Sequence, residues 1–270
     1  NNWVGDIDAK GAPADAFRMR RAAGMQAWYE YMPVRAAMAP RSEMIGTMYR
    51  QARFGDLLSI DFLDTRTFRT DQPCGDNFKP ACAEMAATQA QVISAEEEGW
   101  LTRNLARRDA KWNCMAQQVM MMALDRRNSA DAAEPIYNMD TWAGYKVQRQ
   151  RLLGRMKGLD NVVVLTGDEH QNFAGLLDDG AKPVAVEFVS TSISSGGDGS
   201  DLRPGSDIIL KNNPQLKFIN DQRGYLTCEV TPDAWTTRAM VMDQVSAPGG
   251  QIRARATMTV PRGTPGLSIS

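Results

Sequence analysis

The stretch Val162-Val163-Val164-Leu165-Thr166-Gly167-Asp168-Glu169-His170 carries the strongest fold signal in the chain. Its apolar part is short and rich in β-branched residues, which is typical of a strand buried on both faces of a sheet. Gly167 then ends the run, so a polar turn follows the strand directly. The pattern predicts an α/β protein with this strand inside its sheet.

The turn after this strand is a candidate binding site. Ligands of open α/β sheets bind just beyond the carboxyl ends of strands, and His170 is the only histidine in the chain. Asp168 and His170 are two residues apart, so both side chains can point the same way and offer one carboxylate and one imidazole to a cation. The other interpretation is a surface histidine whose neighbour caps a turn. Because a single histidine accompanies many Asp and Glu residues, the composition favours hard cations with oxygen ligands over a zinc site.

Helix and strand signals alternate on both sides of this turn, as they do in α/β proteins. Ser94 and Glu97 form a capping box that predicts a helix start, and Pro13 and Pro33 bracket another helical pattern. We expect helices at 14–32, from 95 onward and at 142–157, and a central strand running into a helix over 111–124. Further strands are expected at about 46–54, 57–63, 161–166, 184–190, 225–230, 236–242 and 252–260. No repeat or linker divides the chain, so residues 1–270 are expected to form one domain.

The order of several short motifs resembles the PhoD-like alkaline phosphatase and phosphodiesterase family. The matching pieces are Asn1-Asn2-Trp3, Arg53-Phe54-Gly55-Asp56, Leu63-Asp64-Thr65-Arg66, Gln72-Pro73-Cys74-Gly75, Ala116-Gln117-Gln118-Val119, Asp140 to Tyr145, Arg149 to Leu153, Gly167 to His170, Glu187-Phe188, Thr191 to Ser194 and Arg223-Gly224-Tyr225. They cover nearly the whole chain. The resemblance implies a metallophosphoesterase-like αββα sandwich of mixed sheets, of which residues 1–270 are the C-terminal portion without the N-terminal half.

The chain departs from the family pattern in three ways. The family reads Gly-Asp-Val-His where this chain has Glu169, and Trp-Asp-Gly-Tyr where it has Ala143. A carboxylate at position 169 would either alter the metal affinity or be solvated. In the family the Asn-Asn pair follows an Asp-Asp-His-Glu-Val segment, and further metal ligands lie upstream of that segment. The 270 residues alone are therefore expected to be a poor or inactive phosphatase.

The function that the resemblance implies is hydrolysis of phosphate esters by a metal-activated water, with iron and calcium as cofactors. Carried over by motif, His170 contacts the iron side and Asp168 the second metal. The general acid is then a histidine of the upstream segment, so no catalytic residue is assigned in this chain. Asn1 or Asn2 is expected to lie close to the metals, and neither is assigned as a ligand.

Two other functions are open. A serine hydrolase can be built from His170 with Ser192 or Ser195, although the chain has no Gly-x-Ser-x-Gly elbow. A non-catalytic module derived from the phosphatase fold is the stronger rival, because Asp168 and His170 are too few for a binuclear site.

Several other polar residues near predicted strand or helix ends are weaker candidates. Asp64 and Arg66 form either a phosphate-directed pair or a structural ion pair. Asp140, Trp142 and Tyr145 either line the pocket or anchor packing. The glycine-rich run at 194–200 lacks a nucleotide-binding pattern, and its place after a strand makes it a candidate rim of the site.

The composition is that of a globular protein with no electrostatic preference for polyanions. The chain has 31 Lys and Arg against 32 Asp and Glu, so its net charge of −1 gives no case for nucleic acid or an anionic membrane as partner. No apolar stretch approaches the ~20 residues that span a bilayer. The first ten residues are polar and acidic and do not resemble a signal peptide.

The four cysteines suggest a compartment. Cys74 and Cys82 bracket a short polar loop, which favours a disulfide. We expect Cys114 and Cys228 to be free and buried as small apolar residues. A disulfide predicts an oxidising compartment, so the expected location is periplasmic or secreted.

Overall fold

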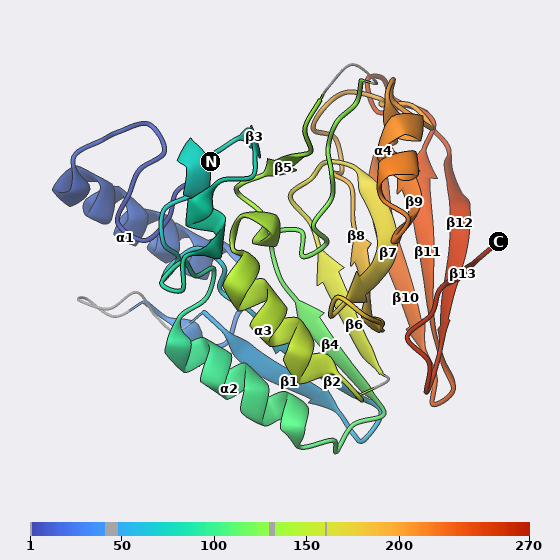
Figure 1. Cartoon of the computed structure of the whole chain (residues 1–270), viewed down its shortest axis with the longest axis horizontal. Helices are drawn as coiled ribbons and strands as arrows, with labels where there is room; N and C mark the ends of the chain where they lie inside the picture. The colour runs from blue at the N-terminus through green and yellow to red at the C-terminus, as the bar shows by residue number, and fades with distance from the viewer. Residues whose placement is uncertain (1, 41–47, 130–132, 160) are drawn as a thin grey trace.

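Two sheets packed face to face, with helices on one side, form the body of the molecule (Figure 1). The computed structural model describes residues 2–40, 48–129, 133–159 and 161–270. The mixed α/β class is confirmed; the larger sheet contains parallel and antiparallel strands, and the smaller sheet is antiparallel. Among these residues, no helix combines the length and apolarity that a membrane crossing requires.

The larger sheet has seven strands, and the candidate turn lies at the carboxyl end of one of its central strands. In spatial order the strands are β1 (Arg50–Phe54), β2 (Leu58–Phe62), β4 (Trp112–Ala116), β6 (Val162–Thr166), β8 (Pro183–Val189), β7 (Asn172–Asp178) and β9 (Leu216–Asn220). The four strands β2, β4, β6 and β8 are parallel neighbours. Strand β1 runs antiparallel to β2, and β7 runs antiparallel to β8. Since β6 lies between β4 and β8, the predicted strand is central and its residues are almost all buried.

Three helices cover one face of this sheet. They are α2 (Ala95–Ala106), α3 (Lys146–Met156) and α4 (Ser206–Asn212). Their apolar residues, such as Leu101, Leu152 and Ile209, pack in one cluster with Val162 and Val164 of the sheet. The start of α2 is as predicted, because the Ser94 hydroxyl accepts from the amide of Glu97 at 3.1 Å.

The first helix, α1 (Ala14–Tyr31), lies at one end of the molecule (Figure 1). It spans nearly the predicted range between Pro13 and Pro33. Phe17 is its buried residue, whereas Met19 and Tyr31 are 75% and 86% exposed. The helix therefore contributes little to the core.

The smaller sheet packs on the other face of the larger one. Its four strands, in spatial order, are β10 (Gly224–Val230), β11 (Ala234–Met242), β12 (Ile252–Pro261) and β13 (Ser268–Ile269). Trp235 and Met258 from this sheet meet Trp112, Val163 and Phe188 from the larger sheet in a second apolar cluster. Each face of β6 is thus covered by its own core, which explains the continuous apolar run in its sequence.

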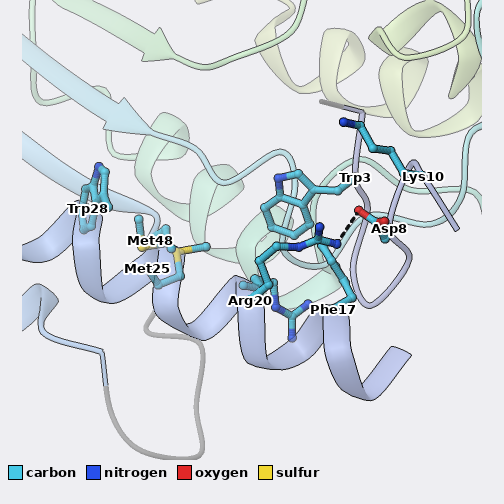
Figure 2. Close-up of a pocket in the computed structure, with 10 residues that line it drawn as sticks. Trp3, Asp8, Lys10, Phe17, Arg20, Met25, Trp28 and Met48 are labelled. Carbon is cyan, nitrogen blue, oxygen red and sulfur yellow. Dashed lines mark ion pairs between the residues drawn. The ribbon is translucent and has the colours of Figure 1, made fainter. Parts of the chain in front are cut away.

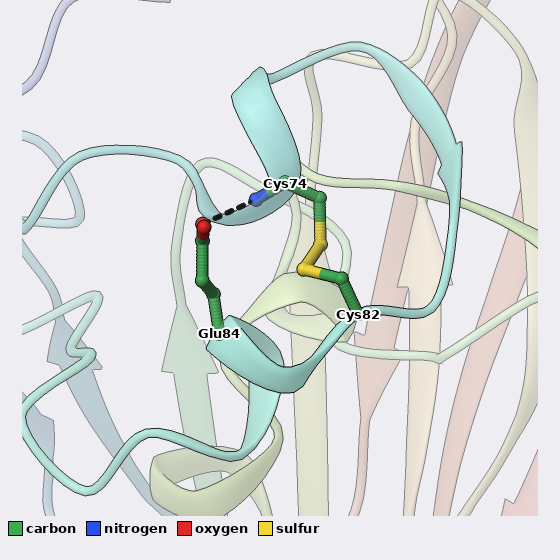
Figure 3. Close-up of a disulfide and its surroundings, with 3 residues drawn as sticks. All are labelled: Cys74, Cys82 and Glu84. Carbon is green, nitrogen blue, oxygen red and sulfur yellow. Dashed lines mark hydrogen bonds between the residues drawn. A yellow bond between two sulfur atoms is a disulfide. The ribbon is translucent and has the colours of Figure 1, made fainter.

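A disulfide closes a short loop between Cys74 and Cys82 (Figure 3). Cys74 and Cys82 are joined as predicted, with their Cα atoms 6.0 Å apart. The carboxylate of Glu84 accepts from the Cys74 amide at 2.7 Å, which ties the two ends of the loop together. The loop contains β3 (Phe78–Pro80), which pairs with β5 (Ile136–Asn138).

Three sequence predictions need correction or fall outside the described residues. No helix follows β4, because residues 117–124 run as an irregular segment whose amides are bound by side chains. Cys228 is free but exposed, since it lies on the edge strand β10, while Cys114 is free and buried as predicted. The start of the strand predicted from Gly46 lies outside the described residues, and β1 begins at Arg50.

Candidate functional site

The turn after β6 holds Asp168 and His170 in an unusual backbone conformation. Their φ angles are 69° and 54°, in the left-handed region that side chains other than glycine rarely adopt. Strain of this kind gathers at functional sites. Both residues are exposed at the carboxyl edge of the larger sheet, as the sequence predicted.

The carboxylate of Asp168 is available to a ligand. Among the described residues, neither of its oxygens has a hydrogen bond or ion pair. Desolvation by the surrounding protein raises the pKa of Asp168, and the positive charge of Arg66 opposes this shift. A bound cation would stabilise the charged form that the protein leaves unpaired.

His170 is held at two atoms by the segment that follows β8. The hydroxyl of Thr191 donates to the His170 carbonyl at 3.2 Å, and the Ser195 hydroxyl lies 3.3 Å from Nδ1 of the imidazole. Of the two serines proposed for a hydrolase, Ser195 therefore reaches the histidine, whereas the Ser192 hydroxyl donates to the Ser195 carbonyl at 2.6 Å.

Glu169 points away from this pair. Its carboxylate forms an ion pair with Arg126 at 2.8 Å and accepts from Asn138 at 3.4 Å, and only 4% of its side chain is exposed. The guanidinium of Arg126 also lies over the rings of Phe78 and Phe173. The carboxylate is thus neither solvated nor free for a metal, and its role is to fix Arg126.

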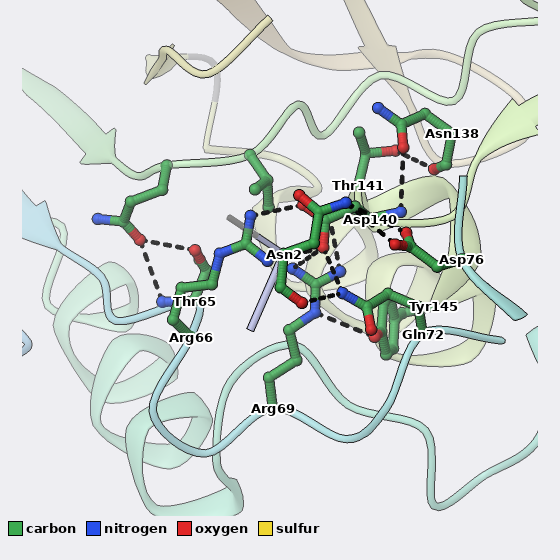
Figure 4. A network of polar contacts seen from close by, with 12 residues as sticks. Asn2, Thr65, Arg66, Arg69, Gln72, Asp76, Asn138, Asp140, Thr141 and Tyr145 are labelled. Atoms are coloured by element: carbon green, nitrogen blue, oxygen red, sulfur yellow. Dashed lines mark hydrogen bonds and ion pairs between the residues drawn. The ribbon is translucent and has the colours of Figure 1, made fainter. Parts of the chain in front are cut away.

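A buried polar network around Asp140 (Figure 4) lies close enough to the turn for the charges of Arg66 and Asp140 to act on Asp168. Asp140 accepts from both terminal nitrogens of Arg66, at 2.6 and 2.5 Å, and from Gln72 at 2.7 Å. Burial raises the pKa of Asp140, but the Arg66 hydrogen bond and the charge of Arg69 outweigh it and leave the pKa lowered. Asp140 is therefore a charged anchor for Arg66.

The expected ion pair between Asp64 and Arg66 is absent from the described residues. Asp64 instead accepts from the backbone amides of Arg66 and Thr67, at 3.1 and 2.9 Å, and so shapes the loop after β2. Arg66 forms its structural ion pair with Asp140.

The aromatic candidates near Asp140 serve packing. Trp142 and Tyr145 are fully buried. Trp142 donates to Gln117 at 3.0 Å, and the Tyr145 hydroxyl accepts from Arg69 at 3.0 Å. Neither side chain reaches solvent at the turn.

Of the amino-terminal pair Asn1 and Asn2, Asn2 contacts the same network. The carbonyl of Asn2 accepts from Gln72 at 2.9 Å, and its side chain donates to Asp76 at 3.1 Å, whereas Asn1 lies outside the described residues. Asn2 thus joins the network of Figure 4 through Gln72.

Glu187 holds the end of β6, from which the turn begins. Its fully buried carboxyl accepts from the amides of Met121 and Met122 and from the hydroxyl of Thr166, each at 2.7 Å. Burial raises its pKa to about 7, and these hydrogen bonds limit the rise. Glu187 belongs to a motif of the resemblance, but its sequence context alone gave it no role.

These features match one known family. The model of the PhoD-like phosphatase family aligns with residues 1–239. The chain belongs to this family. Alkaline phosphatase D of Bacillus subtilis (strain 168) is 41% identical over an alignment of 274 positions, which covers 99% of this chain and 46% of that protein. A solved structure described as "Structure of PhoD" superposes with a TM-score of 0.94 at 40% identity, covering 100% of this chain and 52% of that one. The chain thus spans about half the length of the relatives that it matches.

The turn of this PhoD-like chain carries two side chains of types that can ligate a metal, Asp168 and His170. Among the described residues, no group of three or more His, Cys, Asp or Glu side chains gathers in a way that could hold a metal ion. Asp168 and His170 supply one oxygen and one nitrogen donor on a single turn. Two donors of this kind fit one side of a larger centre and cannot complete it.

A mostly apolar hollow of this PhoD-like chain lies away from the turn, beside α1 (Figure 2). Its volume is about 530 Å³, and Trp3, Phe17 and Trp28 are among its lining residues. Arg20 is paired there with Asp8 at 3.0 Å, so its charge is already neutralised. Neither Asp168 nor His170 lines this hollow.

Proposed function

We propose that this chain provides Asp168 and His170 as ligands of a metal centre that hydrolyses phosphate esters. The observation that carries the proposal is the pairing of an exposed imidazole with a carboxylate that has no partner among the described residues, on one strained turn at the carboxyl end of β6. Family membership supplies the reaction class, since the matching family is one of phosphatases.

The donors suit the iron and calcium that the family resemblance implies. A carboxylate is the ligand that calcium prefers, and a mixed oxygen and nitrogen set is suited to iron. When bound, such cations polarise a phosphate ester and make a hydroxide available near neutral pH. A centre of this kind needs roughly six or more protein ligands, so we propose that the others, and the general acid, come from outside these 270 residues.

Residues around the turn would keep the two ligands in place. Thr191 holds the His170 backbone, and Thr166, fixed by Glu187, anchors the strand end that carries Asp168. Arg66 adds a positive charge that favours the ionised form of Asp168, and Asp140 holds Arg66 in position. These contacts orient the ligands before any cation arrives.

The disulfide supports an oxidising location. Cys74 and Cys82 are joined, and bonds of this type persist outside the reducing cytosol. We therefore propose that the protein works in the periplasm or as a secreted enzyme.

Metal content and turnover test the function together. In protein supplied with the upstream segment that carries the remaining ligands, fused or as a separate chain, Asp168→Asn and His170→Gln should each lower bound iron or calcium, measured by elemental analysis, and hydrolysis of p-nitrophenyl phosphate and bis(p-nitrophenyl) phosphate. Asp207→Asn is the matched control, because Asp207 is exposed in the first turn of α4. Full metal content in both ligand variants would refute the assignment.

The same measurements distinguish a phosphatase from the rival function, a non-catalytic module derived from the phosphatase fold. A non-catalytic module would carry no metal and hydrolyse neither ester, even with its wild-type sequence and with the upstream segment present. Wild-type protein that contains metal and hydrolyses an ester excludes that alternative.

A further inference from the structure

The glycine-rich loop after β8 is held firmly against the candidate site. The buried side chain of Arg223, only 1% exposed, donates to the Ser192 hydroxyl at 3.0 Å and to the Ser195 carbonyl. Asp221 accepts from the same guanidinium at 2.9 Å. Arg223 therefore fixes both ends of the turn that presents Ser195.

The glycines of this loop allow its close approach to Arg223 and Asp221. A Cβ at Gly199 would lie 1.9 Å from the Asp221 carbonyl oxygen, and a Cβ at Gly196 would lie 2.9 Å from Nη1 of Arg223. Both glycines also have φ angles in the left-handed region, at 71° and 94°. The glycine content of this loop thus serves close packing as well as turning.

Asp198 binds the glycine-rich loop to the connection between β11 and β12. Its carboxylate accepts from the amides of Val245 and Ser246, at 2.6 and 2.7 Å, in the connection between β11 and β12. The loop is thereby tied to one end of the smaller sheet, where β10 begins and β11 ends, and Ser195 has a defined position beside His170.

We propose that Ser195 is a positioning residue that accepts a hydrogen bond from Nδ1–H of His170. This contact would leave the lone pair of Nε2 free for the cation and fix the plane of the ring. The inference rests on the proposed role of His170 as a metal ligand. It assigns to the glycine-rich loop, through Arg223, the task of selecting the tautomer of that ligand.

If the donor and acceptor of this hydrogen bond were exchanged, the contact would be that of a serine nucleophile. In that case Ser195 would donate to Nδ1, and an acid would orient the imidazole through Nε2. Among the described residues, no carboxylate is hydrogen-bonded to the His170 ring. The geometry therefore favours the positioning role.

The tautomer can be read directly, because His170 is the only histidine in the 270 residues. The protein is labelled with ¹⁵N-histidine and freed of metal, and its imidazole ¹⁵N shifts are measured at about pH 9, where an ordinary imidazole is neutral. His170→Gln assigns the signal. In the wild type the protonated nitrogen should be Nδ1, and in Ser195→Ala the population should move toward the Nε2–H form that free imidazole favours.

Metal affinity provides the second measurement. With the upstream segment present, titration with Fe²⁺ should show an affinity about tenfold lower for Ser195→Ala, in line with the loss of an outer hydrogen bond to a ligand. Ser195→Thr should restore both the affinity and the Nδ1–H tautomer. Ser194→Ala is the matched control, since Ser194 is exposed in the same loop and its hydroxyl makes no hydrogen bond among the described residues.

Each outcome has one meaning. If Ser195→Ala keeps both the wild-type tautomer and the wild-type affinity while His170→Gln loses metal, the positioning role is wrong and the proposed function stands. If His170→Gln also keeps its metal, the proposed function itself fails. Labelling of Ser195 by an organophosphate, with turnover abolished in both Ser195→Ala and Ser195→Thr, would show a nucleophile and overturn the proposal.

Discussion

Thr166, the last residue of β6, donates its hydroxyl hydrogen to the buried carboxyl of Glu187 on the neighbouring strand β8 at 2.7 Å. The same carboxyl binds the irregular segment after β4 through the amides of Met121 and Met122. One side chain thus links the carboxyl ends of three parallel strands, directly beneath the turn of Asp168 and His170. The geometry of the candidate site therefore depends on a polar contact inside the sheet.

Replacing Glu187 by Gln should weaken this link. The amide can keep the hydrogen bonds from Met121 and Thr166, but its NH₂ group then faces the Met122 amide, and two donors meet. Leaving a buried donor unpaired costs about 1–3 kcal/mol, so the urea midpoint should fall by a corresponding amount. Glu229→Gln, on the exposed face of β10, is the control. An unchanged midpoint would mean that the segment after β4 is held by other contacts.

Stability should also depend on pH through Glu97 in α2. Burial raises its pKa from 4.5 to about 8, helped by the charge of Asp64 and opposed by the hydrogen bond from the Asp64 amide. The folded protein thus holds a proton that the unfolded chain releases. This contribution is complete below pH 4.5 and is lost as the pH rises through about 8.

Glu97→Gln should remove that dependence, because the amide is neutral at every pH. The test compares urea midpoints of the variant and the wild type at pH 5, 7 and 9. The difference should favour the variant increasingly toward pH 9. Glu96→Gln, an exposed neighbour in the same turn, should follow the wild-type profile. Parallel profiles for wild type and Glu97→Gln would contradict the buried proton.

The disulfide should contribute measurably to stability. Closing a loop this short stabilises a fold by about 2–3 kcal/mol, so the double variant Cys74→Ser/Cys82→Ser should unfold at lower urea concentration. Cys228→Ser is the control, because that thiol is free and exposed. Thiol counting under denaturing conditions should find two free thiols, from Cys114 and Cys228. Four free thiols in protein from an oxidising compartment would show that the bond does not form there.

Local signals in the sequence predicted the main elements correctly. The apolar run of β6, the Ser94 cap and the proline-bounded α1 each act within a few residues, so their patterns suffice. The turn of Asp168 and His170 was placed at the correct edge for the same reason. The irregular course of 117–124 was mistaken for a helix because its apolar residues resemble one, whereas Glu187, more than sixty positions away, binds its amides.

The partners of the site residues depended on contacts between distant segments. Ser195 reaches His170 from 25 positions away, and Arg66 pairs with Asp140 across 74 positions. No local pattern distinguishes these pairs from other combinations of the same residue types. The sequence therefore located the candidate ligands but not the side chains that hold them.

Glu169 provides the sharpest test of which carboxylate on the turn is a ligand. It stands beside Asp168 in sequence, yet its side chain is 4% exposed and paired with Arg126, itself 10% exposed. Removing one partner of a buried pair leaves the other charge uncompensated at a cost of about 3–5 kcal/mol. Glu169→Val should therefore destabilise the protein strongly in urea unfolding.

The double variant Glu169→Val/Arg126→Met should recover much of that loss, since it removes both charges and keeps the apolar contact with Phe78 and Phe173. With the upstream segment present, bound metal per folded chain should stay at the wild-type level in this double variant, whereas Asp168→Asn should lose it. A double variant that folds but has lost its metal would identify Glu169 as a ligand, and the ion pair with Arg126 would then be an arrangement that the protein abandons when a cation binds.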